Sequence, residues 1–187
     1  MKKKVIISII AFSLLIGGTV LTNAKPKSNL AKMWGNVLSK DYEKKESKKN
    51  NEYRISLYGK ISEKTEEIND IAEEGKDILI ATDEIDKAEE FYKINGNDEE
   101  VAKEKAKSYV EGQNALYIEA IKKGYDVTDK ELDQYIAELK ETVSTAENRE
   151  VAQDIIDSFD SEEDYWKYER ELYKKLFPIQ KYVKKLE

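Results

Sequence analysis

The chain has 187 residues, a net charge of −7, 12 tyrosines, and neither histidine nor cysteine. The absence of those two residue types excludes histidine-based acid–base catalysis, Ser-His-Asp and Cys-His nucleophiles, the usual zinc sites and disulfides. We therefore expect a protein that is not an enzyme, holds no cofactor and no metal, and is stabilised by packing alone.

The N-terminus has the pattern of a secretory signal peptide. Three lysines at residues 2–4 precede an apolar run over residues 5–21, and Ala24 offers a small residue for cleavage. We predict cleavage after Ala24. Because the apolar run is only slightly shorter than a membrane-spanning helix, retention of residues 1–24 as a membrane anchor is the alternative. Either way we expect the rest of the chain to be extracytoplasmic, secreted or anchored to the outer face of the cytoplasmic membrane.

Residues 25–52 are predicted to form a basic tether or a frayed helix. Residues 25–60 contain 10 basic and 4 acidic side chains, whereas residues 61–187 contain 19 basic and 35 acidic ones. The stretch DYEKKESKKNNE is dense in charge and has few apolar anchors. A solvated arm is the simplest interpretation, and attraction to anionic lipid head groups or wall polymers is the alternative. The acidic body argues against nucleic acid as a partner.

Residues 53–187 are predicted to form one mostly α-helical domain. The stretch EYRISLYGKIS alternates apolar and polar residues, which predicts a short strand or hairpin near residues 53–61. From Glu63 onward, apolar residues recur at helical spacing, and this predicts a helix that Gly75 can interrupt. The stripe of that helix comprises Ile68, Ile71, Ile78, Ile85 and Tyr92.

A bend between two helices is specified by the stretch AIKKGYDVTDKELDQYI, residues 120–136. Gly124 is predicted to end the first helix in the left-handed conformation. Thr128 and Glu131 have the spacing of a capping box, and Val127 with Leu132 has that of a hydrophobic staple. The second helix is therefore expected to start at once.

Other helix boundaries follow from the same rules. Asn97 with Glu100 is predicted to cap the helix that carries Val101 and Ala102, and Ser161 to cap the last helix. Pro178 is expected to kink that last helix. We assign the acidic residues after Ser161 to the first turn of the helix, where the helix dipole favours negative charge, and not to a catalytic pair.

Aromatic residues concentrate in the last helix. Most tyrosines have helical spacing and are expected in the core. Tyr165, Trp166 and Tyr168 together cover more than one helix face, so we expect some rings of this helix to stay partly exposed. Amphipathic rings at exposed positions bind apolar peptide without requiring a particular sequence. The candidate residues for contact with a bound polypeptide are Trp166, Tyr168, Tyr173 and Tyr182.

Two stretches, YIEAIKKGYDVTDKELDQYIAELK and IIDSFDSEEDYWKYERELYKKLFPIQKYVKKL, resemble the N-terminal helical domain of extracytoplasmic foldases of the SurA and PrsA type. The shared features are a helix that ends in Ala-x-x-x-Gly, a Val-Thr/Ser-Asp-x-Glu helix start and a later Ser-x-Glu-Asp-Tyr helix. The resemblance covers residues 101–187. The stretch ISLYGKISEKTEEI is more weakly similar to the strand that enters that domain, with Tyr58 in place of an asparagine.

The resemblance implies a domain that cradles unfolded polypeptide. A parvulin-type isomerase domain usually accompanies it, but this chain has none of the histidines of parvulin active sites. We therefore expect an exported, non-catalytic, chaperone-like protein whose partners are unfolded or exported polypeptides. The alternative is a structural or interaction protein of the cell surface or membrane that binds one dedicated partner.

Overall fold

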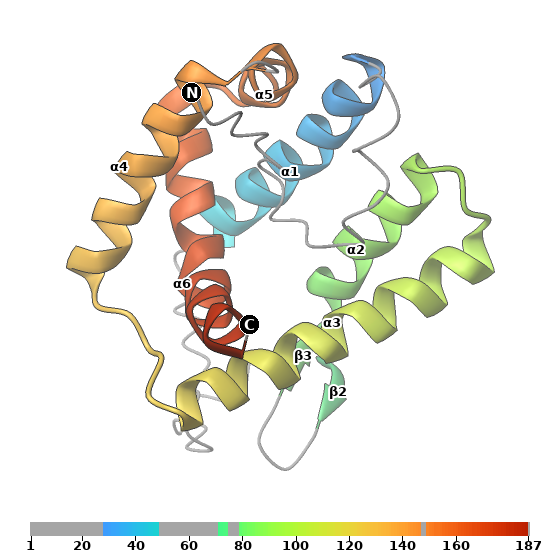
Figure 1. The fold of residues 1–187 in the computed structure, drawn as a ribbon. Helices are drawn as coiled ribbons and strands as arrows, with labels where there is room; N and C mark the ends of the chain where they lie inside the picture. Colours follow the sequence, from blue (N-terminus) through green and yellow to red (C-terminus); the bar gives the residue numbers. More distant parts are fainter. Residues whose placement is uncertain (1–27, 49–70, 75–78, 147–148, 187) are drawn as a thin grey trace. The chain divides into compact units, whose positions relative to one another are not determined.

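The computed structural model describes residues 28–48, 71–74, 79–146 and 149–186, and most of these residues are helical, as predicted (Figure 1). Contacts divide the chain into two compact units. One contains the chain through Ser39 together with Ala120–Glu187, and the other contains Lys40–Glu119. Residues 28–39 of the first helix therefore belong to the same unit as the C-terminal helices.

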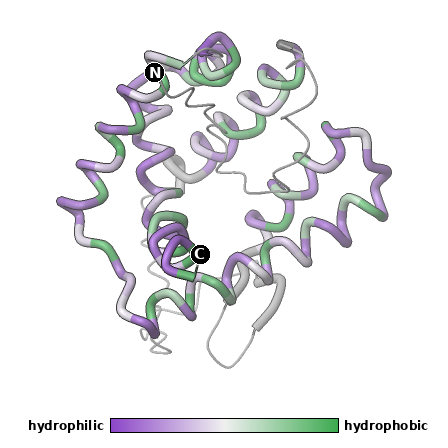
Figure 2. Tube along the Cα trace, viewed as in Figure 1, coloured by the Kyte–Doolittle hydropathy of each residue, from purple (hydrophilic) through white to green (hydrophobic). Residues whose placement is uncertain are grey.

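The first unit is built from the N-terminal part of α1 (Ser28–Lys48) and from α4 (Asp129–Thr145), α5 (Arg149–Ile156) and α6 (Glu162–Leu186). α4 packs against both α5 and α6. Hydrophobic and hydrophilic residues alternate along α4 and α6, as expected of amphipathic helices (Figure 2). Burial of one large apolar side chain contributes about 1.5–3 kcal/mol, so this core contributes more than the helix caps do. Its largest fully buried side chains include Leu132, Tyr165, Tyr168 and Ile179.

α1 lies in the segment predicted as a tether or frayed helix, and the structure shows a packed helix there. Ala31, Trp34 and Leu38 are buried. Their spacing of three and four residues puts them on one helix face. On the same helix, Lys32 Nζ lies 3.5 Å from Asp154 Oδ1 of α5. The high charge density of the segment favoured the prediction of a tether. Three apolar residues at helical spacing are nevertheless enough to pack one face of the helix.

Gly35 permits a close approach between α1 and the C-terminal end of α5. A Cβ atom at this position would overlap Ser158 Oγ and would lie 3.0 Å from Ile155 Cα. Any larger residue would therefore push the two helices apart. This glycine is needed for packing and not for a special backbone conformation.

The second unit contains a two-stranded antiparallel sheet followed by helices. β2 (Ile71–Glu74) pairs with β3 (Leu79–Ala81), with an irregularity between Ile71 and Glu73. The prediction of a helix is therefore wrong over these strands. The seven-residue spacing of the isoleucines fits a helix, but the short apolar run that ends at Ala81 fits a strand equally well. Pairing with residues 71–74 decides between the two.

α2 (Thr82–Ile94) and α3 (Glu99–Lys122) follow the hairpin. α2 ends at Ile94, and Gly96 follows with a φ of +87°, the left-handed conformation that favours glycine after a helix. Asp98, and not Asn97, caps α3, because Val101 N donates to Asp98 Oδ1 at 2.9 Å. Asn97 instead donates through Nδ2 to the carbonyl oxygen of Tyr92 at 2.8 Å. The predicted cap by Asn97 and Glu100 is therefore wrong.

The core cluster of the second unit is small. Its buried members are Ala88 on α2 with Ala106 and Val110 on α3, and Ile85, Tyr92 and Tyr109 pack around them. The predicted strand near residues 53–61 and the predicted signal peptide or anchor over residues 1–24 lie outside the described residues.

Candidate functional site

The bend between α3 and α4 begins where the sequence predicts. Gly124 has a φ of +80°. Its N–H donates to the carbonyl oxygen of Ile121 at 2.9 Å, and Tyr125 N–H donates to that of Ala120 at 3.0 Å. These two bonds form a Schellman motif, which satisfies the last carbonyl groups of α3. The motif fixes the direction in which the chain leaves the helix.

The predicted capping box starts α4. Glu131 N donates to Thr128 Oγ1 at 3.2 Å, and Thr128 N donates to Glu131 Oε2 at 2.9 Å. Each residue therefore satisfies a backbone N–H that the helix leaves without a partner. Leu132, the apolar residue that follows, is buried in the core of the first unit.

Lys181 of α6 connects the bend to the last helix. Its Nζ donates to Glu131 Oε1 at 3.2 Å and to the carbonyl oxygen of Asp126 at 3.4 Å. The hydrogen bonds from the Thr128 backbone and side chain, followed by those from Lys181, lower the pKa of Glu131 to about 2. The carboxylate thus stays charged and keeps both its cap and its lysine partner down to acidic pH.

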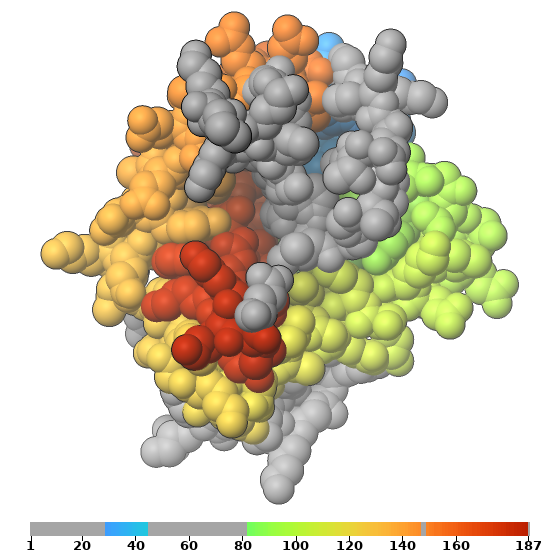
Figure 3. Space-filling model, viewed as in Figure 1, coloured from blue at the N-terminus to red at the C-terminus, as the bar shows by residue number. Residues whose placement is uncertain are grey.

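A pair of partly exposed tyrosines lies beside this connection. The ring centroids of Tyr125 and Tyr182 are 5.6 Å apart, with an interplanar angle of 53°. Val183 and Leu186 follow on α6 and are 37% and 66% exposed. We call Tyr125, Tyr182, Val183 and Leu186 the α6-end surface. Figure 3 shows the end of α6, in dark red, at the surface of the viewed face.

Of the four residues predicted to contact polypeptide, only Tyr182 belongs to this surface. Trp166, Tyr168 and Tyr173 are 5%, 2% and 4% exposed and lie in the core. Some rings of this helix do stay partly exposed, Tyr182 among them, but these three do not. In this conformation their rings cannot touch a bound chain.

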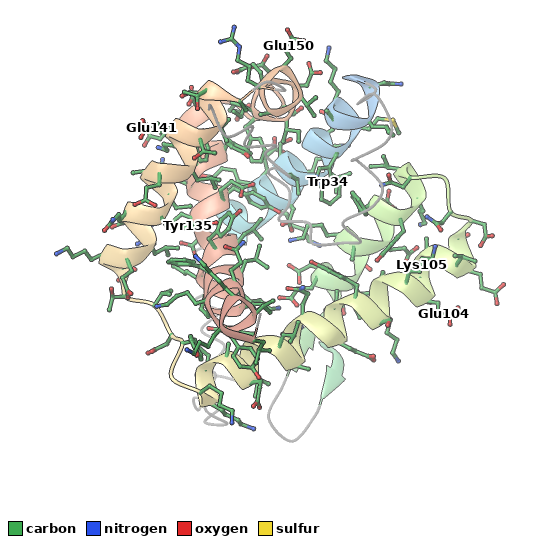
Figure 4. All side chains as sticks on the ribbon, viewed as in Figure 1. Trp34, Glu104, Lys105, Tyr135, Glu141 and Glu150 are labelled. Carbon is green, nitrogen blue, oxygen red and sulfur yellow. The ribbon has the colours of Figure 1, made fainter. Side chains whose placement is uncertain are left out.

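The rings are buried because several elements cover α6. Phe159, which follows α5, packs against Tyr165 and Tyr168 with centroid distances of 5.4 and 5.6 Å. Tyr135 extends from α4 toward α6 (Figure 4), where its centroid lies 5.0 Å from that of Tyr173. A helix that packs on more than one side has room for aromatic residues on more than one face. Sequence periodicity alone does not reveal those additional neighbours.

Glu169 is a carboxyl group buried within this aromatic core. Burial, and after it the charge of Glu169, raises the pKa of Tyr165 and of Tyr173 far above the ordinary range. Burial also raises the pKa of Tyr135, although hydrogen bonds with Tyr173 and Gln180 oppose the shift. These phenols therefore remain protonated at neutral pH. They can act as hydrogen-bond donors but not as bases.

The described part of the chain contains neither a cluster of metal-binding side chains nor a membrane-spanning helix. No group of three or more acidic residues there could hold a metal ion. No helix in these ranges is both long and apolar enough to cross a bilayer. The apolar run of residues 5–21 lies outside them.

No protein-family model matches the chain, and no curated protein or solved structure matches it significantly.

Tyr125 was not among the residues predicted to contact a bound polypeptide. One signal was present, because Tyr125 directly follows the glycine of a Schellman motif. The residue at that position is frequently apolar and contacts a neighbouring side chain. Here the partner is Tyr182 on a different helix.

Proposed function

We propose that this protein is an exported, non-catalytic, chaperone-like protein that binds unfolded or extended polypeptide segments, and that the α6-end surface makes the apolar contact. The observation that carries the proposal is the tyrosine pair with Val183 and Leu186 exposed beside it. Tyrosine offers a large apolar face at low entropic cost together with a hydroxyl group for hydrogen bonds. Such a surface suits segments of varied sequence.

The framework behind this surface supports the proposal. Lys181 bonds to Glu131 and to the Asp126 carbonyl oxygen, so it holds the bend that carries Tyr125 against α6. A surface that is already ordered loses little conformational entropy on binding. The contact can therefore be useful although it is small, and each encounter is expected to be weak and reversible.

The sequence supplies further support. The resemblance of residues 101–187 to SurA- and PrsA-type helical domains implies polypeptide binding, and the N-terminal pattern implies export with a possible membrane tether. Both inferences are part of the proposal. It includes no catalytic step and no cofactor.

The second candidate is an interaction protein of the cell surface or membrane with one dedicated partner. The small extent of the α6-end surface favours this candidate, since a general chaperone must hold long stretches of chain. The same four residues would then contact one folded protein, and binding would saturate at a fixed ratio.

An aggregation assay on several chemically unfolded proteins tests the proposal. We expect suppression at near-stoichiometric ratios that persists at high salt, because apolar contacts are not screened. The double variant Tyr182→Ala/Leu186→Ser should lose suppression, whereas Leu116→Ser, a change at a 37% exposed leucine of α3, should retain it. A folded protein that suppresses no aggregation would refute the chaperone proposal and favour the dedicated partner.

A further inference from the structure

Charge is distributed very unevenly along α6. Its segment 172–186 contains five lysines and no acidic residue, whereas its segment 162–171 contains five acidic and two basic residues. The preceding part of the chain, residues 61–171, contains 34 acidic and 14 basic side chains. Tyr182, Val183 and Leu186 of the α6-end surface therefore lie in a basic segment that follows a strongly acidic one.

Two of these lysines border the apolar stripe that Tyr182, Val183 and Leu186 form on α6. At 3.6 residues per turn, Lys184 lies beyond Val183 on one side of the stripe, and Lys185 lies beyond Tyr182 on the other side. Both lysines are exposed, and neither forms a hydrogen bond or ion pair with another described residue. Their charges are therefore available to a binding partner, in contrast to that of Lys181, which the bend engages.

The helix dipole accounts for only part of this pattern. Positive charge in the last turn of a helix is favourable, which explains Lys184 and Lys185 in general terms. The effect falls off within one turn and does not extend to Lys174 and Lys175, which lie more than two turns before the end of α6. Lys174 is instead paired with Glu171, from which its Nζ lies 2.7 Å away. The positive charge that is left for a partner is therefore that of Lys184 and Lys185.

We infer that the α6-end surface selects extended polypeptide segments in which acidic residues flank apolar ones. This inference rests on the proposed function and names its substrate class. The apolar residues of the segment contact Tyr182, Val183 and Leu186, and its carboxylates lie near Lys184 and Lys185.

The expected size of the preference for acidic flanks follows from the strength of exposed ion pairs. Each is worth at most a few-fold in affinity, so two lysines together should give roughly a 3- to 10-fold preference. Screening should remove this preference at high ionic strength, because the Debye length falls to about 3 Å at 1 M salt. The apolar part of the binding should remain.

The test uses three fluorescent peptides that share one apolar and aromatic centre and carry flanks of aspartate, serine or lysine. Affinity is measured by anisotropy with the purified protein at low and at high salt. We expect the aspartate-flanked peptide to bind roughly 3- to 10-fold more tightly than the serine-flanked one at low salt, and equally at high salt. Lys184→Gln/Lys185→Gln should abolish the preference, whereas Lys103→Gln/Lys107→Gln, an equal charge change on α3, should preserve it.

The outcomes separate the inference from the proposed function. Equal binding of the aspartate- and serine-flanked peptides would overturn the inference and leave the proposed function intact. Failure of all three peptides to bind would count against both. Binding of the protein to vesicles of anionic phospholipid is the last measurement. If the protein binds them through Lys184 and Lys185 while showing no preference among the peptides, the basic segment serves a lipid surface and the inference is wrong.

Discussion

Lys181 on α6 contacts two groups of the α3–α4 bend at once, since its Nζ lies 3.2 Å from Glu131 Oε1 and 3.4 Å from the Asp126 carbonyl oxygen. Glu131 simultaneously completes the capping box of α4. One carboxylate therefore both starts a helix and anchors the bend to the end of α6. This connection places Tyr125 against Tyr182 and so forms the α6-end surface.

The first prediction concerns the stability of the protein at acidic pH. The pKa of Glu131 is about 2 in the folded protein, below its ordinary value of 4.5, so its contribution to stability is fully present above pH 4.5 and is lost as pH falls toward 2. We expect Glu131→Gln to flatten the dependence of the unfolding free energy on pH within that window. Urea unfolding at several pH values within this window measures the unfolding free energy of both proteins. An unchanged pH dependence would show that the Glu131 bonds do not persist in solution.

The second prediction concerns the N-terminal cap of α4. Thr128→Ala removes the acceptor for Glu131 N and should lower the unfolding free energy by about 0.5–2 kcal/mol. Ser144→Ala is the matched control, because Ser144 is exposed and bonds only to a carbonyl within its own helix. That control should stay within about 0.5 kcal/mol of the parent protein. Equal effects of the two changes would contradict the assigned cap.

The third prediction compares two glycines in helices. Gly35→Ala would push α1 away from Ser158 and Ile155, and we expect it to cost about 1–3 kcal/mol. Gly112→Ala on α3 meets no atom within 4 Å and should stabilise the protein by about 0.5–1 kcal/mol through helix propensity. Thermal unfolding of both variants measures the difference. Stabilisation by both changes would show that α1 does not pack as described.

The fourth prediction distinguishes core rings from surface rings. Tyr168→Ala and Tyr173→Ala each remove a buried ring, and each should cost about 3–5 kcal/mol. Tyr182→Ala removes a partly exposed ring and should cost far less. Chemical denaturation followed by far-ultraviolet circular dichroism gives all three values. A mild effect at position 168 or 173 would return that residue to the list of candidate contact residues.

Local rules predicted the helix boundaries that depend on neighbours in sequence. Gly124, Thr128, Glu131 and Ser161 act as predicted, because a cap involves residues only a few positions apart. The cap of α3 was misplaced by one residue, because Asn97 and Asp98 are both good caps and only the backbone geometry distinguishes them.

Features that depend on distant partners could not be predicted. The strand Leu79–Ala81 exists because residues 71–74 pair with it, and the burial of Trp166, Tyr168 and Tyr173 depends on other helices. The turn at Gly124 was predicted, whereas the contact of the next residue, Tyr125, with Tyr182, 57 residues later, was not. The candidate site was therefore only partly predictable from the sequence.

A methyl NMR titration tests the central claim most directly. The probes are Val183 and Leu186, with the buried Leu132 and Ile136 of α4 as internal references, and the ligand is an extended peptide with an apolar centre. We predict that the methyl signals of Val183 and Leu186 shift progressively with peptide concentration while those of Leu132 and Ile136 do not move. Binding that leaves Val183 and Leu186 unshifted would contradict the assignment of polypeptide binding to the α6-end surface.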